Sequence, residues 1–260
     1  IEKYDVPGGT CLNVGCIPSK ALLQSSQMFY KMTHHAKLHG IECGHLSYNF
    51  DKMMQRKKEI IQSFNKGIEG LFKKNQVTFI KGTASFIDPY NIEVSTSAGK
   101  DIYKAKYFLC ATGSKPVALP FAPFDETKII SSTGALSLAN VPKKLIVVGA
   151  GIIGVELGSV YSRLGAEVVF LEFMDRICPT LDKSLSKAFQ KILEKQGLSF
   201  LLETKVTELR ATAEGVYLKA EVGTEIKEFS ADQALVAVGR KPYTAGLNLE
   251  GIGVRVSEKG

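Results

Sequence analysis

The sequence of 260 residues lacks any run of about 18 uncharged apolar residues, the length that a membrane-spanning helix needs. It also lacks a block of basic charge. The net charge of +7 arises from 33 Lys and Arg against 26 Asp and Glu, and the two signs alternate along most of the chain. A nucleic-acid-binding protein instead gathers its basic residues into a stripe with aromatic platforms. We therefore expect neither a membrane nor a nucleic acid among the partners.

Cysteine and histidine are also scarce. The five cysteines are an odd number and mostly scattered, which is typical of a reducing compartment with one catalytic disulfide rather than of a secreted scaffold. The four histidines lie between residues 34 and 45, where His35, His39 and Cys43 have a spacing that could suit a metal ion. Nothing else in the pattern fixes such ligands. We interpret this segment as a polar helix end and loop, and expect no metal site.

Two cysteines, Cys11 and Cys16, flank a short stretch that contains glycine. A continuous α-helix would hold their Cα atoms about 8.6 Å apart, whereas a disulfide needs roughly 4.4–6.8 Å. A bond between them therefore requires a bend, which Gly15 permits, and Pro18 suits the first turn of a following helix. A strained disulfide at a helix start is easily reduced, which favours a redox-active pair. Two unrelated buried thiols, or half of a metal site, remain alternatives at this point.

A glycine-rich turn, with Gly149, Gly151 and Gly154 in the spacing GxGxxG, follows a run of buried-strand character at 145–148. A helical pattern at 155–164 comes directly after it. In this context the glycines permit a tight turn and bring a pyrophosphate to the N-terminus of the helix. The motif therefore predicts a dinucleotide-binding βαβ unit.

The acidic residue Glu172 follows the next predicted strand, at 167–171. A carboxylate at this place accepts hydrogen bonds from a ribose 2′-hydroxyl and repels a 2′-phosphate. Glu172 therefore favours NAD over NADP, although the nearby Arg176 could attract a 2′-phosphate.

The rest of the pattern predicts alternating helices and strands around these motifs. Two long helices are expected at 17–37 and 50–72, and the segment 116–142, rich in Pro and Ser, is interpreted as a connection. Short strands are expected at 77–81, 91–95 and 107–110, a crossover helix at 181–196, and further strands at 199–202, within 207–229 and at 234–238.

The string from Gly8 to Lys20 resembles the active-site signature of the flavin disulfide reductase family. Its continuation, IPSKALL at 17–23, resembles the dihydrolipoamide dehydrogenase branch, because glutathione and trypanothione reductases usually carry a second Lys in place of Ser19. The resemblance extends over residues 2–260.

This resemblance implies an α/β fold with two Rossmann-like three-layer dinucleotide-binding domains, each with a β-meander. Residues 1–115 would form an FAD-binding domain, incomplete at its N-terminus, that carries the redox pair. Residues 116–246 would form an inserted NAD-binding domain, and residues 247–260 the start of the return to the FAD domain. The family's N-terminal FAD turn and its C-terminal dimerisation domain, which supplies a His–Glu acid/base dyad, have no counterpart here. We therefore expect the sequence to be an excerpt of a longer chain, inactive by itself.

The resemblance also implies roles for individual residues. Cys11 would be the interchange thiol that meets the substrate, and Cys16 the thiolate that faces the flavin. The residues implied at the FAD site are Glu2, Gly9, Thr10, Lys20, Gly82, Ala111, Thr112 and Gly113. Those expected at the NAD site are Gly149, Gly151, Ile152, Ile153, Gly154, Glu172, Gly239 and Arg240, although Arg240 could equally be an ordinary solvated side chain.

A contact between Lys20 and Glu156 is a further expectation. Glu156 lies at the border of an apolar stripe on its predicted helix, where an unpaired carboxylate would cost several kcal/mol of desolvation. The resemblance implies that Lys20 is its partner, beside the flavin, and that the pair joins the FAD and NAD domains. The stripe itself consists of Ile153, Leu157, Val160 and Leu164.

The activity that the resemblance implies is oxidation of dihydrolipoamide to lipoamide with NAD as acceptor, through FAD and the Cys11–Cys16 disulfide. The implied partners are dihydrolipoyl groups of acyltransferases or of glycine-cleavage carrier proteins, in a homodimer, in a bacterial cytoplasm or a mitochondrial matrix. Two alternatives stay open: an NADPH-dependent reductase of the glutathione or mercuric type, and a non-catalytic dinucleotide-binding module with structural cysteines.

Overall fold

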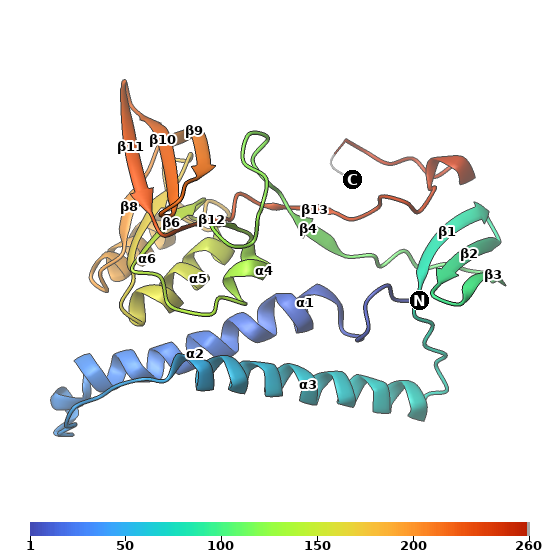
Figure 1. Cartoon of the computed structure of the whole chain (residues 1–260), viewed down its shortest axis with the longest axis horizontal. Helices are drawn as coiled ribbons and strands as arrows, with labels where there is room; N and C mark the ends of the chain where they lie inside the picture. The colour runs from blue at the N-terminus through green and yellow to red at the C-terminus, as the bar shows by residue number, and fades with distance from the viewer. Residues whose placement is uncertain (259–260) are drawn as a thin grey trace. The chain divides into compact units, whose positions relative to one another are not determined.

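Residues 1–258 are described by a computed structural model, and helices, a parallel sheet and antiparallel sheets give the expected α/β fold (Figure 1). The chain forms two compact units. The first comprises residues 1–13, 61–115 and the chain from 240, and the second comprises 14–60 and 116–239. The units meet along the chain after residues 13, 60, 115 and 239, and the domain boundaries expected at 115 and 246 remain a prediction. The cofactor assigned to each domain remains a prediction, and residues 259–260 of the predicted return segment lie outside the described residues.

A five-stranded parallel sheet lies in the second unit, in the order β5-β12-β6-β7-β8. Its longer strands are rich in Val, Ile and Leu. Both faces of a parallel sheet are covered by other elements, so side chains on both faces are apolar. The strands predicted around the glycine-rich turn are confirmed. The sheet consists of β5 (Ile129–Ile130), β6 (Lys144–Val148), β7 (Glu167–Leu171), β8 (Ser199–Leu201) and β12 (Gln233–Val236).

The crossover between β6 and β7 is α5 (Ile152–Arg163). Gly158 allows this helix to approach the sheet closely, since a methyl group on its Cα would lie 2.4 Å from the Phe170 ring. The predicted apolar stripe is confirmed, because its residues from 157 to 164 are buried and Ile153 packs on the same core. The helix α2 (Cys16–His34) packs against α5. The unit also contains η1 (Ala36–His39), α4 (Ser132–Ala135), the predicted crossover helix α6 (Lys183–Glu194) and the first part of α3 (Phe50–Lys74).

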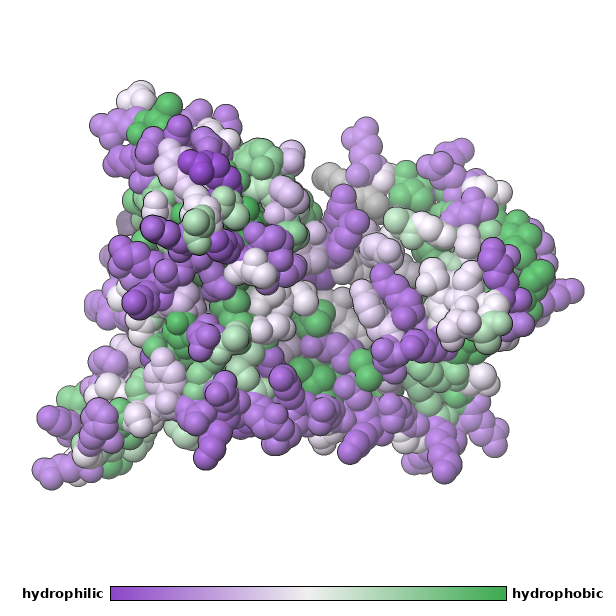
Figure 2. All heavy atoms as spheres, in the orientation of Figure 1, coloured by the Kyte–Doolittle hydropathy of each residue, from purple (hydrophilic) through white to green (hydrophobic). Residues whose placement is uncertain are grey.

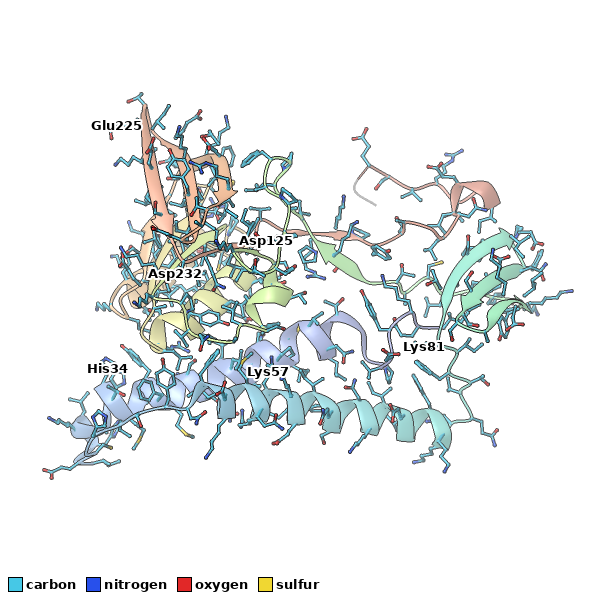
Figure 3. All side chains as sticks on the ribbon, viewed as in Figure 1. His34, Lys57, Lys81, Asp125, Glu225 and Asp232 are labelled. Atoms are coloured by element: carbon cyan, nitrogen blue, oxygen red, sulfur yellow. The ribbon has the colours of Figure 1, made fainter. Side chains whose placement is uncertain are left out.

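An antiparallel meander follows β8 in the chain, as predicted. Its apolar face shares a core with Ile146 and Val148 of β6 through Leu209 and Leu218. After the meander, the Asp232 carboxylate accepts hydrogen bonds of 2.7 and 2.9 Å from the two backbone N–H groups at the start of β6 (Figure 3). The strands are β9 (Thr204–Ala211), β10 (Val216–Val222) and β11 (Glu225–Ala231).

The first unit contains a second antiparallel meander, whose core includes Phe86, Val94 and Leu247. The chain begins in this unit and leaves it near the end of α1 (Gly9–Val14), and the part of α3 from residue 61 belongs to it. Figure 2 shows hydrophilic residues along the outward side of α3. The remaining elements are β1 (Thr83–Asp88), β2 (Asn91–Thr96), β3 (Gly99–Lys104), β4 (Ser114–Pro116), which pairs with β13 (Arg240–Pro242), and η2 (Glu250–Ile252).

Two predicted strands are wrong. Residues 77–81 make only a single bridge, between Glu2 and Lys81, and residues 107–110 form no strand. Tyr107 and Leu109 are 82% and 92% exposed, so this run is not buried either. A strand needs a neighbour that satisfies its backbone N–H and C=O groups, and no segment within residues 1–258 pairs with 107–110. Conversely, the predicted connection 116–142 contains β5 and α4. Both are too short for a hydrophobic periodicity to reveal them in the sequence.

Of the helices within residues 1–258, none combines the length and the apolar character that crossing a bilayer requires.

Candidate functional site

The two cysteines of the redox motif lie on separate helices. Cys11 lies on α1, Cys16 opens α2, and Gly15 between them has φ −137° and ψ −118°. The predicted departure from a continuous helix is therefore confirmed. Both cysteines are exposed, and Cys11 has a free thiol in the structure, so its pairing with Cys16 remains a prediction.

Cys178 has the opposite environment. It is 2% exposed, and its backbone N–H donates to Ala150 O at 2.8 Å. Burial raises the pKa of the Cys178 thiol, and the carboxylates of Glu172 and Glu156 raise it further. A thiol of this kind is a poor nucleophile at neutral pH, so Cys178 is a packing residue beside the glycine-rich turn.

Several residues predicted at the FAD site lie together in the first unit. The backbone N–H of Glu2 donates to Ile80 O at 3.0 Å, and the N–H of Gly82 donates to Glu2 O at 2.9 Å. Near the cysteine turn, a methyl group on the Cα of Gly113 would lie 3.5 Å from Thr10 Oγ1. The structure thus brings Glu2 to Gly82, and Thr10 to the loop that contains Ala111, Thr112 and Gly113.

Tyr243 holds this loop, and no motif in the sequence identifies it. Its backbone N–H donates to Gly113 O at 2.9 Å, and Thr112 Oγ1 donates to Tyr243 O at 2.6 Å. Nearby in the sequence, Arg240 donates from Nε to Ser114 Oγ at 2.8 Å and from Nη2 to Ser114 O at 2.6 Å. Arg240 therefore belongs to the first unit and anchors β13 to β4, and the contact with NAD expected for it remains a prediction.

The glycine-rich turn is tightly packed at two of its glycines and open at the third. Gly149 has φ +96°, and a methyl group on its Cα would lie 2.7 Å from Ala237 O. A methyl group on Gly154 would lie 2.2 Å from Gly149 O, so the helix could not start this close to the turn with any larger residue. Gly151, at the N-cap of α5, has no atom within 4 Å of such a methyl group. The turn is thus closed on the protein side and open at Gly151, where a ligand can approach.

Ile152, Ile153 and Gly239 flank this turn. Ile152 is half exposed at the first position of α5, whereas Ile153 packs on the core. Gly239 has φ +142°, and its carbonyl accepts a 3.0 Å hydrogen bond from Val117 N–H.

The Glu172 carboxylate is buried beside the turn. One oxygen accepts a 2.6 Å hydrogen bond from Ala150 N–H, and the other accepts a 2.8 Å bond from Met174 N–H. Glu172 is only 7% exposed, so these bonds fix its orientation. A carboxylate has about four acceptor positions, which leaves positions for a ribose hydroxyl.

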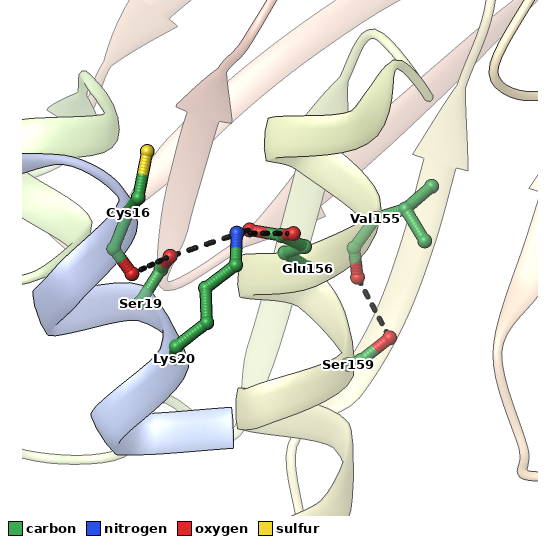
Figure 4. A network of polar contacts seen from close by, with 6 residues as sticks. All are labelled: Cys16, Ser19, Lys20, Val155, Glu156 and Ser159. Atoms are coloured by element: carbon green, nitrogen blue, oxygen red, sulfur yellow. Dashed lines mark hydrogen bonds and ion pairs between the residues drawn. The ribbon is translucent and has the colours of Figure 1, made fainter. Parts of the chain in front are cut away.

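Lys20 and Glu156 form the predicted ion pair, with 2.6 Å from Nζ to Oε1 and 2.8 Å from Nζ to Oε2 (Figure 4). The Ser19 hydroxyl, which is buried, lies 3.1 Å from Cys16 O and 3.3 Å from Glu156 Oε2. Sequence reasoning missed this contact, although Ser19 lies one helical turn after Cys16. Both partners belong to the second compact unit, because α2 packs with α5, and the expectation that the pair joins an FAD domain to an NAD domain remains a prediction.

The histidine-rich segment, 34–45, comprises the end of α2, η1 and the loop that follows. No group of three or more His, Cys, Asp or Glu in the described part of the chain could hold a metal ion.

Comparison with known proteins agrees with the family resemblance of the sequence motifs. A family model described as pyridine nucleotide-disulphide oxidoreductase matches residues 2–260. The mitochondrial dihydrolipoyl dehydrogenase of Pisum sativum is 48% identical over 263 residues, which cover 100% of this chain and 52% of the relative. Leghemoglobin reductase of Glycine max is 46% identical, with 100% and 50% covered, and dihydrolipoyl dehydrogenase 3 of Pseudomonas putida is 46% identical, with 100% and 56% covered.

Among solved structures, the Cu(II) complex of the HOCl-induced flavoprotein disulfide reductase RclA from Escherichia coli matches with a TM-score of 0.82 and 28% identity. The match covers 100% of this chain and 54% of that chain. The chain thus spans about half the length of the relatives that it matches.

Proposed function

Because the chain belongs to the pyridine nucleotide-disulphide oxidoreductase family, we propose that the whole protein oxidises dihydrolipoamide to lipoamide with NAD as the two-electron acceptor. The observation that carries this proposal is the interruption of the helix at Gly15, with one exposed cysteine on each side. A pair spaced in this way needs such an interruption to form a disulfide. The relatives named dihydrolipoyl dehydrogenase support the choice of substrate.

Two sets of residues fit the cofactors of this family. The open approach at Gly151, the tight turn at Gly149 and the oriented carboxylate of Glu172 suit NAD. The contact of Glu2 with Gly82, and that of Thr10 with Gly113, suit FAD. When bound, FAD and NAD supply the two-electron transfer that links a dithiol to a nicotinamide. The other residues proposed at these sites are Gly9, Lys20, Ala111, Thr112, Ile152, Ile153, Gly154, Gly239 and Arg240.

The cysteines carry out thiol–disulfide exchange. One thiolate of the dihydrolipoyl group attacks the Cys11 sulfur, the bond between Cys11 and Cys16 breaks, and Cys16 leaves as a thiolate. The second substrate thiol then displaces Cys11 from the mixed disulfide. Lipoamide leaves with its own disulfide, and two electrons remain on the cysteine pair. The pair of Lys20 and Glu156 is proposed to lie beside the flavin, where the ammonium group favours negative charge.

The preference for NAD over NADP rests on the environment of Glu172. Its carboxylate is held in place by Ala150 and Met174, and it would repel a 2′-phosphate. Arg176, the cation that follows Glu172 in the sequence, is engaged through both Nη atoms: Nη1 donates to Asp175 at 2.6 Å and Nη2 donates to Pro179 O at 3.2 Å. An engaged guanidinium is less able to attract a 2′-phosphate.

The partners proposed for the whole protein are dihydrolipoyl groups of acyltransferases or of glycine-cleavage carrier proteins, bound by a homodimer. A mitochondrial matrix or a bacterial cytoplasm fits the names of the relatives, one mitochondrial and one from a bacterium.

Steady-state kinetics of the whole protein test this function. With lipoamide as the acceptor, we expect NADH to be preferred to NADPH by at least about a hundredfold, and we expect no turnover of glutathione disulfide. C11S and C16S should each abolish turnover of lipoamide while NADH still binds, and C43S, at a cysteine outside the motif, serves as the control. A preference for NADPH with glutathione disulfide would contradict the proposal, and a protein without flavin would indicate a non-catalytic dinucleotide-binding module.

A further inference from the structure

We propose that Asn65, on α3, is a positioning residue that fixes the turn carrying Cys11. Asn65 is 6% exposed, and its side-chain amide points into the first unit toward the cysteine turn rather than along its own helix. Nδ2 donates to Pro7 O at 2.7 Å and to Asn13 Oδ1 at 3.0 Å. These partners lie 58 and 52 residues away in the sequence.

Asn13 completes a network around the turn. Its own Nδ2 donates to Pro7 O at 3.0 Å and to Gly9 O at 3.1 Å. Four hydrogen bonds from two amide groups therefore hold the backbone on both sides of Gly8 and the last turn of α1. Each Nδ2 has two acceptors, so both N–H groups of each amide are used, and a network of this kind restrains the backbone that it holds.

The turn needs external support for two reasons. The helix α1 has only six residues, and a helix of this length is not stable alone in water. Gly8 has φ +110°, and a methyl group on its Cα would lie 2.8 Å from the Leu12 side chain, so the chain enters the helix through a tight bend. The amide of Asn65 is the buried donor that joins the start of this bend to its end at Asn13.

A purely local role for Asn65 is disfavoured by the chemistry of helices. Asn in a helix interior is less favourable than Ala, Leu or Lys, and its amide usually returns to the local backbone. Asn75, just beyond the end of the same helix, does this: its Nδ2 donates to Leu71 O at 2.8 Å and it is exposed. Asn65 instead donates both N–H groups of its side chain to the cysteine turn.

The inference rests on the proposed function in one respect, the role of Cys11 as the thiol that meets the dithiol substrate. The test therefore uses the whole protein and two kinds of readout. N65D replaces both donors by acceptors with almost no change in shape, and places an oxygen against Pro7 O and Asn13 Oδ1. N65L removes the donors without adding a charge. N75D, at the residue just beyond the end of the same helix, is the matched control.

We expect N65D and N65L to lower kcat/KM for dihydrolipoamide by about tenfold or more, since small misplacement of a reacting group is costly. Oxidation of NADH by ferricyanide, which does not need the cysteine turn, should change by less than about twofold. Backbone amides of residues 10–14 should exchange hydrogen at least about tenfold faster, while those of β6 and β7 remain unchanged. N75D should alter none of these quantities.

A parallel loss of both activities would show a merely structural role and overturn the inference. Unchanged hydrogen exchange at residues 10–14 would overturn it as well. If the unmodified protein does not oxidise dihydrolipoamide, the proposed function fails on its own, and the exchange measurement still decides the role of Asn65.

Discussion

Lys20 Nζ lies within hydrogen-bond distance of both carboxylate oxygens of Glu156, although the two residues are 136 positions apart in the sequence. The side chain of Lys20 is 57% exposed and that of Glu156 is 24% exposed. Ion pairs in such surroundings contribute at most about 1 kcal/mol to stability. The folding energy that the pair supplies is therefore small, and its proposed role beside the flavin can be tested separately from stability.

The substitution E156Q tests this separation. Gln has nearly the same shape as Glu but removes the negative charge that Lys20 faces. We expect the free energy of unfolding to fall by no more than about 1 kcal/mol, while the rate of NADH oxidation with lipoamide falls by about tenfold or more. E167Q, in the exposed pair that Glu167 forms with Lys144 at 3.3 Å, should change neither quantity. An unchanged rate in E156Q would contradict a functional role.

Two glycines of the same turn should respond differently to alanine. In G154A the new methyl group would lie 2.2 Å from Gly149 O, so we expect unfolding to become easier by at least about 2 kcal/mol. In G151A the methyl group meets no atom within 4 Å, and the φ of −70° suits alanine. G151A should therefore keep its stability but bind NADH at least about tenfold more weakly, because the methyl group occupies the ligand's path. Chemical denaturation and NADH titration measure the two effects. Equal stability losses in both variants would contradict this reading of the turn.

The nucleotide-binding half of the site was predictable from the sequence because its signals are local. The strand before Gly149, the helix after Gly154 and the acidic residue Glu172 lie within about 30 residues, and each has its own pattern. The ion pair was predictable because Glu156 borders an apolar stripe and needed a cation, and the resemblance supplied Lys20.

Other features could not be predicted from the sequence because they depend on contacts between distant segments. The runs 77–81 and 107–110 have the composition of strands, but composition does not provide a neighbour to pair with. In the sequence, Asn65 looks like an ordinary helix residue. Only the folded structure places its Nδ2 at 2.7 Å from Pro7 O. Tyr243 holds the loop at Gly113 through backbone groups, which carry no signal in the sequence.

The Glu172 carboxylate should be sensitive to the loss of one oxygen. In E172Q an NH₂ group replaces an oxygen that now accepts from the N–H of Ala150 or Met174. Two donors then face each other in a buried place, so we expect a loss of about 1–3 kcal/mol in unfolding free energy, together with weaker binding of NADH. E194Q, on an exposed residue of α6, is the control. Unchanged stability in E172Q would show that these hydrogen bonds do not hold the turn.

Lys57 provides a prediction about pH. Its side chain is 5% exposed in the core of the second unit, and its Nζ donates to Leu136 O (Figure 3). Burial lowers the pKa of Lys57 to about 8 from its usual value of 10.5, and the charge of Lys58 adds to this effect. The folded protein therefore loses the Lys57 proton at a lower pH than the unfolded chain does. Between about pH 8 and 10.5 the unfolded chain binds more protons at this site, so the contribution of Lys57 to stability must rise with pH in this window.

The substitution K57M isolates this contribution. Met fits the apolar surroundings but leaves Leu136 O without its donor, a cost that does not depend on pH. The unfolding free energy of the wild-type protein, relative to that of K57M, should therefore rise by about 3 kcal/mol between pH 7 and pH 10.5. Most of this shift should occur above pH 8, because Lys57 is protonated in both states at lower pH. K66M removes an exposed lysine from the same helix, and its difference from the wild type should stay constant with pH. Denaturant unfolding at several pH values measures both differences, and a K57M difference that does not vary with pH would show that Lys57 is not desolvated in the folded protein.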